Sequence, residues 1–199
     1  MNPLAMFLVL APGADPRSDR RVLAEPDHET LIVWVPDAAA AAEVAATEAA
    51  GSVRLIEMYG GYDVAAITEV TRAVDGRAAV GRAVGVSSRP AVGARHTATI
   101  YEAPVDAASV THELPGGLRT DIRPAPDAET AVALARRLVA EGADLVEICG
   151  GTPIGTAAAV AAALGDQVAV TAVTWPFDAL APASAFAAEH SVHADQFRS

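Results

Sequence analysis

The chain contains the same short phrase twice, 90 residues apart. Ile56–Gly61 reads IEMYGG and Val146–Gly151 reads VEICGG, so each copy has a glutamate between hydrophobic residues and ends on two glycines. Downstream, Ala66–Val80 aligns with Thr156–Val170 without a gap. This period is too long for a solenoid repeat and matches the length of a small domain. The sequence therefore predicts a tandem duplication of one domain-sized unit.

Each copy alternates strand-like and helix-like segments. In the second copy, Asp127 is a good helix N-cap and Gly142 suits the position after the helix end. Thr152 followed by Pro153 predicts another N-cap with proline in the first turn. The short apolar runs DLVEI and QVAVTAV are typical of parallel strands that are covered on both faces. The second copy is predicted to have strands 96–103, 118–125, 143–149 and 167–174, and helices 127–141 and 153–164.

The first copy repeats this pattern, with strands 4–11, 30–35, 53–59 and 78–86, and helices 37–50 and 63–74. Alternation of this kind with short links implies right-handed β-α-β crossovers. The predicted fold class is α/β, with two β-β-α-β-α-β units of mainly parallel strands arranged as an internal pseudo-dimer. Two helices per unit are too few for an eight-stranded β/α barrel.

The expected domain boundaries follow the repeat. They are a first repeat at 1–88, a linker at 89–95, a second repeat at 96–176 and a tail at 177–199 with one short helix. Single-copy relatives would form two-fold homodimers, and further homo-oligomerisation stays open.

Composition excludes several classes of protein. A net charge of −11 and an isoelectric point near 4.7 argue against a nucleic-acid partner. The single cysteine excludes an intrachain disulfide and fits a reducing, cytoplasmic compartment. The apolar start, MNPLAMFLVL, corresponds to a strand of the second copy, so we expect a strand there and not a targeting segment. No apolar run is long enough to predict a membrane span, and no motif predicts a cofactor.

The order of segments, with LAPG after the first strand, VPD before the first helix and IEMYGG before the second, resembles a small uncharacterised bacterial family of roughly hundred-residue α/β domains. Its members carry a Glu-hydrophobic-Cys-Gly-Gly phrase. The second copy matches through VEICGG, whereas the first has Tyr59 where Cys149 lies in the second. The resemblance covers both copies but not the tail, and it implies a fold without a function.

The turn at Gly150, Gly151 and Thr152 is the candidate ligand site. It opens a helix at the carboxyl end of a parallel strand, where backbone amides and the helix dipole suit an anion. The alternative is that the glycines only permit a tight turn. In the first copy Asp63 follows the glycines and would repel an anion. We therefore expect one site per chain, in the second copy, for a small anionic metabolite.

Glu57, Glu147 and Cys149 are the candidate catalytic residues. A glutamate in an apolar strand is costly to bury unless it is paired or protonated. It serves either as a general base of raised pKa or as a structural partner for arginine or backbone amides. Its presence in both copies favours the structural role, so we expect both glutamates to be buried and hydrogen-bonded. On this view Glu147→Gln lowers stability by about 1–3 kcal/mol. Cys149 is either a thiolate favoured by the helix N-terminus or a packing residue.

Three classes of function follow. The first is a small-molecule-binding protein or enzyme that uses the turn after the second glutamate. The second is a non-catalytic structural or regulatory module. The third is a metal-dependent enzyme that uses the tail histidines His190 and His193, in a segment that ends at Asp195, although no third ligand is evident and we expect no metal.

Overall fold

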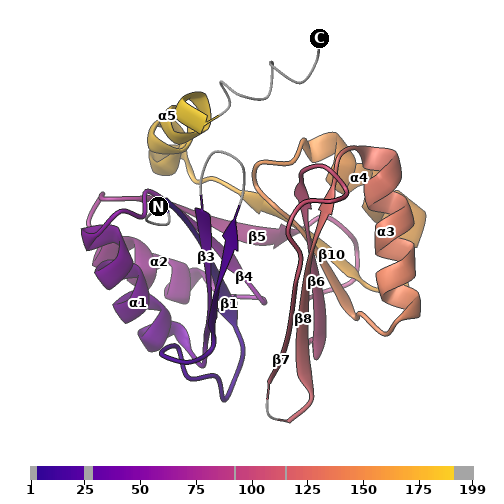
Figure 1. Ribbon diagram of the computed structural model, residues 1–199, viewed down its shortest axis with the longest axis horizontal. Coiled ribbons are helices and arrows are strands. Elements are labelled where there is room, and N and C mark those ends of the chain that lie inside the picture. The colour runs from indigo at the N-terminus through magenta and orange to yellow at the C-terminus, as the bar shows by residue number, and fades with distance from the viewer. Residues whose placement is uncertain (1–3, 25–28, 92, 115, 191–199) are drawn as a thin grey trace. The chain divides into compact units, whose positions relative to one another are not determined.

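A computed structural model of the chain describes residues 4–24, 29–91, 93–114 and 116–190 (Figure 1). Within these ranges it has a mixed sheet of ten strands and five α-helices. The first repeat consists of β1 (Ala5–Leu10), β2 (Arg20–Ala24), β3 (Glu29–Val35), α1 (Ala38–Ala50), β4 (Leu55–Tyr59), α2 (Val64–Val74) and β5 (Ala79–Gly85). The second consists of β6 (His96–Glu102), β7 (Val110–Leu114), β8 (Leu118–Ala125), α3 (Ala128–Ala140), β9 (Leu145–Ile148), α4 (Ile154–Leu164) and β10 (Ala169–Thr174).

The twelve elements predicted for the two copies are present, with ends within two residues of those expected. The predicted β-β-α-β-α-β order is nevertheless wrong, because each repeat has one strand more than expected. This additional strand is β2 in the first repeat and β7 in the second. Both lie at the ends of the strand order and pair antiparallel with β3 and β8, respectively. In β7 the burial alternates along VTHEL, and β2 is mostly exposed. Edge strands of this kind lack the continuous apolar run that identified the inner strands.

The hydrogen-bonded strand order is β2-β3-β1-β4-β5-β10-β9-β6-β8-β7. In each repeat the first strand therefore lies between the third and the fourth. The pairs β1–β3, β6–β8, β6–β9 and β9–β10 are parallel, as expected of β-α-β crossovers. The last part of β5 pairs antiparallel with β10. The parallel strands place the turn after β9 at the carboxyl end of the strands that surround it.

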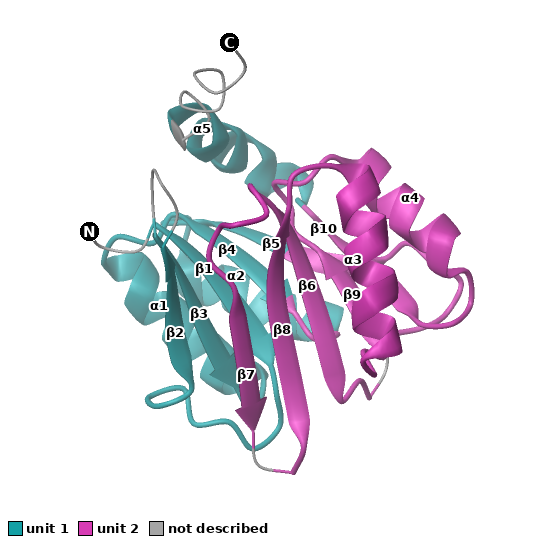
Figure 2. Cartoon of the chain, turned by 45° about the vertical axis from the view of Figure 1, so that its right-hand side comes forward, with its two compact units in different colours: residues 1–58, 62–81, 175–199 teal, residues 59–61, 82–174 magenta. Residues whose placement is uncertain are grey.

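The chain divides into two compact units that follow the repeats except at the turn Tyr59–Gly61, at residues 82–88 and in the tail (Figure 2). The first unit contains residues 1–58 and 62–81 and the tail from Trp175, which forms a short 3-10 helix, Phe177–Ala179, and α5 (Leu180–His190). The second unit contains residues 82–174 together with the turn Tyr59–Gly61. The placement of this turn in the second unit matters for function, because the turn carries the glycines of the first phrase.

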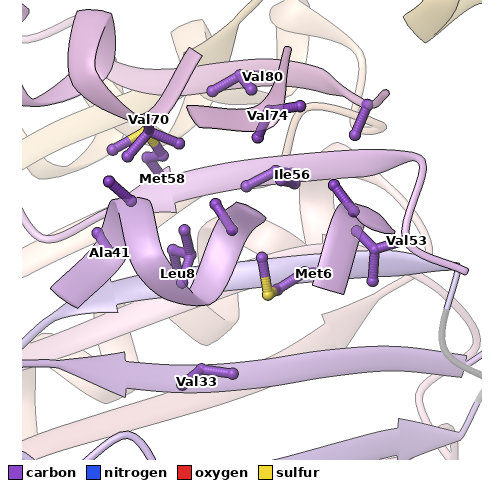
Figure 3. Packing of buried hydrophobic residues seen from close by; sticks show 14 of the residues in the cluster. Met6, Leu8, Val33, Ala41, Val53, Ile56, Met58, Val70, Val74 and Val80 are labelled. Atoms are coloured by element: carbon purple, nitrogen blue, oxygen red, sulfur yellow. The ribbon is translucent and has the colours of Figure 1, made fainter. Parts of the chain in front are cut away.

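The core of the first unit lies between its strands and the helices α1 and α2 (Figure 3). Met6 and Leu8 of β1 alternate with residues of the other sheet face and point toward the helices, as do Ile56 and Met58 of β4. Alanines form the buried stripe of α1, so this helix packs close to the sheet. Burial of each large aliphatic side chain stabilises the unit by about 1.5–3 kcal/mol.

The second unit has the equivalent core. Ile100, Val146 and Ile148 of the strands pack with Leu138 of α3 and Val160 of α4. Asp127 caps α3 by accepting from the amide of Thr130 at 2.8 Å, and Gly142 follows the helix end with a φ of 106°. These two sequence predictions are confirmed. Of the helices described here, none is long and apolar enough to cross a membrane.

Candidate functional site

Glu147 lies in the middle of β9 on the face of the sheet that is turned away from the helices. Its neighbours Val146 and Ile148 belong to the helix-facing core, and side chains alternate along a strand. In the register of the sheet, Glu147 stands between Thr99 of β6 and Thr171 of β10. Its exposure is 0%, which confirms the predicted burial. A polar row therefore crosses three neighbouring strands of the second unit.

The two oxygens of the Glu147 carboxyl have different surroundings. Oε1 accepts from the backbone amide of Gly60 at 3.0 Å and from the hydroxyl of Thr171 at 3.4 Å. Oε2 is buried and has no hydrogen-bond partner among the described residues. The Oγ1 of Thr99, on the neighbouring strand, is also buried without one. Buried polar atoms are normally paired, so this part of the row calls for an explanation.

Burial raises the pKa of Glu147 to about 7, against the hydrogen bonds from Gly60 and Thr171, which lower it. Removal from water disfavours the charged form, and two hydrogen bonds to one oxygen do not compensate for that loss. Near neutral pH both protonation states are therefore populated. A carboxyl in this state can donate or accept a proton, the property that a general acid or base requires.

The Gly60 amide connects the two phrases. The glutamate of the second phrase binds the first glycine of the first phrase, within the second compact unit. Gly60 and Gly61 have φ values of 94° and 83°, which residues other than glycine rarely adopt. The predicted bond from a backbone amide is confirmed for Glu147. Glu57 is 2% exposed, so its predicted burial is confirmed as well.

The turn after β9 differs from the turn after β4. The amide of Thr152 donates to the carbonyl of Cys149 at 3.0 Å, and α4 begins at Ile154 with Pro153 in the N-cap position. The prediction that Thr152 caps the helix is therefore wrong. Its Oγ1 is buried without a partner, and α4 has no side-chain cap. The reason is that the helix starts at Ile154, so the N-cap position belongs to Pro153, whose side chain has no acceptor for the first-turn amides.

Gly151 does not have the conformation that would require a glycine. It is absent from the residues with positive φ, and a Cβ built on it would meet nothing within 4 Å. In the first copy, by contrast, a Cβ on Gly61 would approach the carbonyl oxygen of Ala91 to 3.0 Å. The tight-turn explanation therefore fits Gly61 but not Gly151. The missing side chain of Gly151 leaves open space next to the start of α4.

Cys149 is half-buried at the end of β9, and its amide donates to the carbonyl of Ile100 at 2.9 Å. His193, Asp195 and the side chain of His190 lie outside the described residues. Within the described part of the chain, no group of three or more His, Cys, Asp or Glu side chains is arranged to hold a metal ion.

Sequence reasoning missed a second polar cluster, around Asp121 of β8. This carboxylate is 0% exposed and accepts from Arg119 at 2.8 Å and Arg123 at 2.5 Å. The His96 ring lies 2.7 Å away and the Thr111 hydroxyl 2.6 Å away. Burial opposes ionisation, but the hydrogen bonds, led by that from Arg119, outweigh it and lower the pKa of Asp121. The signal was RTDIR, in which arginines two residues before and after an aspartate share its strand face.

The fold and the two phrases define a protein of two tandem α/β domains in which the glutamate of one phrase binds the glycine turn of the other. Residues 4–95 and 96–188 each match DUF6506, described as a family of unknown function. The chain belongs to this family as a tandem duplication, which confirms the resemblance seen in the sequence. The expectation that the resemblance stops before the tail is wrong, because the second match extends to residue 188. No curated protein and no solved structure matches the chain.

Proposed function

We propose that the protein binds a small anionic metabolite at the turn formed by Gly150, Gly151 and Thr152. The observation that carries the proposal is the contrast between the starts of α2 and α4. Asp63 caps α2 by accepting from the amide of Ala66 at 2.8 Å. The corresponding residue before α4 is Pro153, which provides no side-chain cap. The first-turn amides of a helix have no intrahelical partner and attract anions.

Two further features support this site. The Oγ1 of Thr152 is a buried hydroxyl with no hydrogen-bond partner in the described part of the chain, so a ligand oxygen would satisfy it. Gly151 leaves space at the same turn without being required by its own conformation. A phosphate or carboxylate group placed there would accept from backbone amides and from the threonine hydroxyl. The first copy offers no equivalent, because the Asp63 carboxylate occupies the helix start.

An associated enzyme activity would use Glu147 as its acid or base, since this carboxyl exchanges its proton near pH 7. The Glu147–Gly60 bond favours the other candidate, a non-catalytic module in which Glu147 only holds the turn of the first phrase. The two candidate functions differ in the role of Oε2. In an enzyme this oxygen would exchange a proton with the substrate, whereas in a structural module it would have no function.

The substitution Pro153→Asp tests the proposed site, because it gives α4 the cap that α2 already has. An added cap stabilises a helix by about 0.5–2 kcal/mol, so the free variant should melt a few degrees higher than the wild type. The introduced carboxylate should also abolish stabilisation by ligand. Thermal-shift measurements with phosphate and a panel of phosphorylated and carboxylated metabolites would show both effects.

Asp63→Ala is the matched control, since it removes the cap of the first copy and leaves the proposed site intact. We expect it to melt lower than the wild type and to keep the full ligand-induced shift. The proposal is wrong if no compound of the panel stabilises the wild type, or if Pro153→Asp responds to a ligand as the wild type does.

A further inference from the structure

The second unit contains a groove of about 300 Å³ along one side of helix α3. Arg123 of β8 and Ser109, which precedes β7, line it opposite the helix. None of the residues that line the groove is acidic, although the chain as a whole has a net charge of −11. The helix contributes Thr130, Ala133, Leu134 and Arg137.

The two arginines of the groove have different tasks. The terminal nitrogens of Arg123 are held by the carbonyl of Val110 at 2.7 Å and the carboxylate of Asp121 at 2.5 Å, so this guanidinium is fixed in place. Arg137 is 65% exposed, and its Nε lies 3.8 Å from the carboxylate of Glu141, longer than a hydrogen bond. Its donors are therefore available to a ligand, and guanidinium groups favour oxyanions.

The first unit has a groove at the equivalent position, but acidic side chains line it. It measures about 420 Å³ and is lined by the positions of α1 that correspond to those of α3 at the offset of 90 residues. Glu43 stands in place of Ala133, and Thr47 in place of Arg137. The two grooves occupy equivalent positions of the repeat and differ at two of them, where the first has an acid and no base and the second has a base and no acid.

The arginines of the first groove are also neutralised locally. Arg17 lies 3.1 Å from Asp15, and Arg20 lies 2.7 Å from Glu48. With Glu43, three carboxylates line this groove against two guanidinium groups. An anion would meet net repulsion there. The first groove therefore serves as an internal comparison for the second.

We propose that the groove along α3 is a second ligand site, separate from the turn after β9, for a small organic anion. Its oxyanion group, a carboxylate or a phosphate, binds Arg137 and the hydroxyls of Ser109 and Thr130. Its apolar body lies against Leu134. The volume is at the lower end of the range of about 300–1,000 Å³ that small-molecule sites occupy, which restricts the ligand to a small molecule.

Benzoate and phenyl phosphate are suitable probes, because they carry the two oxyanions on the same apolar ring. Benzamide is the neutral control. In an amide NMR titration of the full chain, the anionic probes should shift the resonances of residues 130–137, whereas benzamide should not. A response to only one of the two anions would identify that oxyanion as the ligand group.

Arg137→Thr, which introduces the residue found at the equivalent position of the first groove, should weaken binding roughly tenfold, the contribution of one charge-assisted contact. Ala133→Glu should weaken it at least as much. Arg136→Thr removes an exposed arginine beside the groove that does not line it, and it should bind as the wild type does. Melting temperatures of the three variants would verify that each is folded.

Pro153→Asp separates this site from the one proposed above, since it should leave binding in the groove unchanged. Two results would overturn the inference. One is the absence of anion-dependent shifts along α3. The other is equal weakening by Arg137→Thr and Arg136→Thr, which would show a diffuse effect of net charge and no site.

Discussion

Replacing Glu147 by glutamine measures what a buried carboxyl of raised pKa costs this fold. The glutamine side chain has the same size and keeps an oxygen that can accept from Gly60, but it cannot ionise. The sequence alone predicts a loss of about 1–3 kcal/mol on this substitution. The structure makes the effect depend on pH, because burial disfavours the charged form of Glu147.

The sign follows from the two pKa values. Below pH 4.5 the carboxyl is protonated in the folded and the unfolded chain, so it adds no cost of ionisation. Between pH 4.5 and about 7 the unfolded chain releases the proton and the folded chain retains it, so the free energy of unfolding falls as the pH rises. At about 1.4 kcal/mol per pH unit, this separation is worth about 3 kcal/mol above pH 7.

The variant should therefore be the less stable protein in acid and the more stable one in base. At pH 5 the wild-type carboxyl is protonated and already buries one O–H where Oε2 has no partner among the described residues, whereas the glutamine NH₂ group buries one further N–H there, which costs about 1–2 kcal/mol. At pH 8.5 the wild type also carries the ionisation cost of about 3 kcal/mol, and the order reverses by about 1–2 kcal/mol.

Urea unfolding followed by far-UV circular dichroism between pH 5 and 8.5 would measure both free energies. Glu102→Gln is the matched control, an exposed glutamate on the neighbouring strand β6, and its difference from the wild type should stay nearly constant. A difference between wild type and Glu147→Gln that does not change with pH would refute the reasoning, because it would mean that Glu147 titrates alike in the folded and unfolded chain.

Asp121→Asn leaves two guanidinium groups without their carboxylate and should cost about 2–3 kcal/mol, less than a fully buried pair because both arginines reach solvent. Since the pKa of Asp121 is lowered, this difference from the wild type should shrink in urea titrations as the pH falls below 3.8. Gly61→Ala should lower stability by about 1–2 kcal/mol, because it combines a positive φ with a close approach to the Ala91 carbonyl. Gly151→Ala should melt within a degree or two of the wild type but bind the anion at the proposed turn more weakly, which calorimetry would detect.

The inner elements of both repeats could be predicted because their signals are local. Asp127 and Gly142 mark the ends of α3, and apolar runs mark the strands between helices. β2 and β7 could not, since half-exposed edge strands carry a pattern that polar loops share. The start of α4 was misplaced by one residue, because a threonine before a proline and a proline in the N-cap position give the same sequence.

The candidate site was predictable only in part. Burial of Glu147 follows from its place in an apolar strand, but its partner is the amide of a residue 87 positions away, a contact that only the tertiary fold determines. The unpartnered Oε2 is likewise invisible in a sequence. The Asp121 cluster, by contrast, is visible in the sequence RTDIR, where the charged residues occupy alternate positions of a strand. A search for opposite charges on one strand face would have found it.

The contrast between the two glycine turns assigns different roles to the two copies. In the first copy, the positive φ values of Gly60 and Gly61 require glycine. The Gly60 amide donates to Glu147, and Asp63 caps the start of α2, so these groups have structural roles. In the second, Thr152 Oγ1 is left without a partner, and the start of α4 has no side-chain cap. Unpaired buried polar groups lower stability, and a bound anion would offset that cost at the turn that we propose as a ligand site. The position of the first copy that corresponds to Thr152 is Tyr62, so the two turns differ in side chain as well as in backbone conformation.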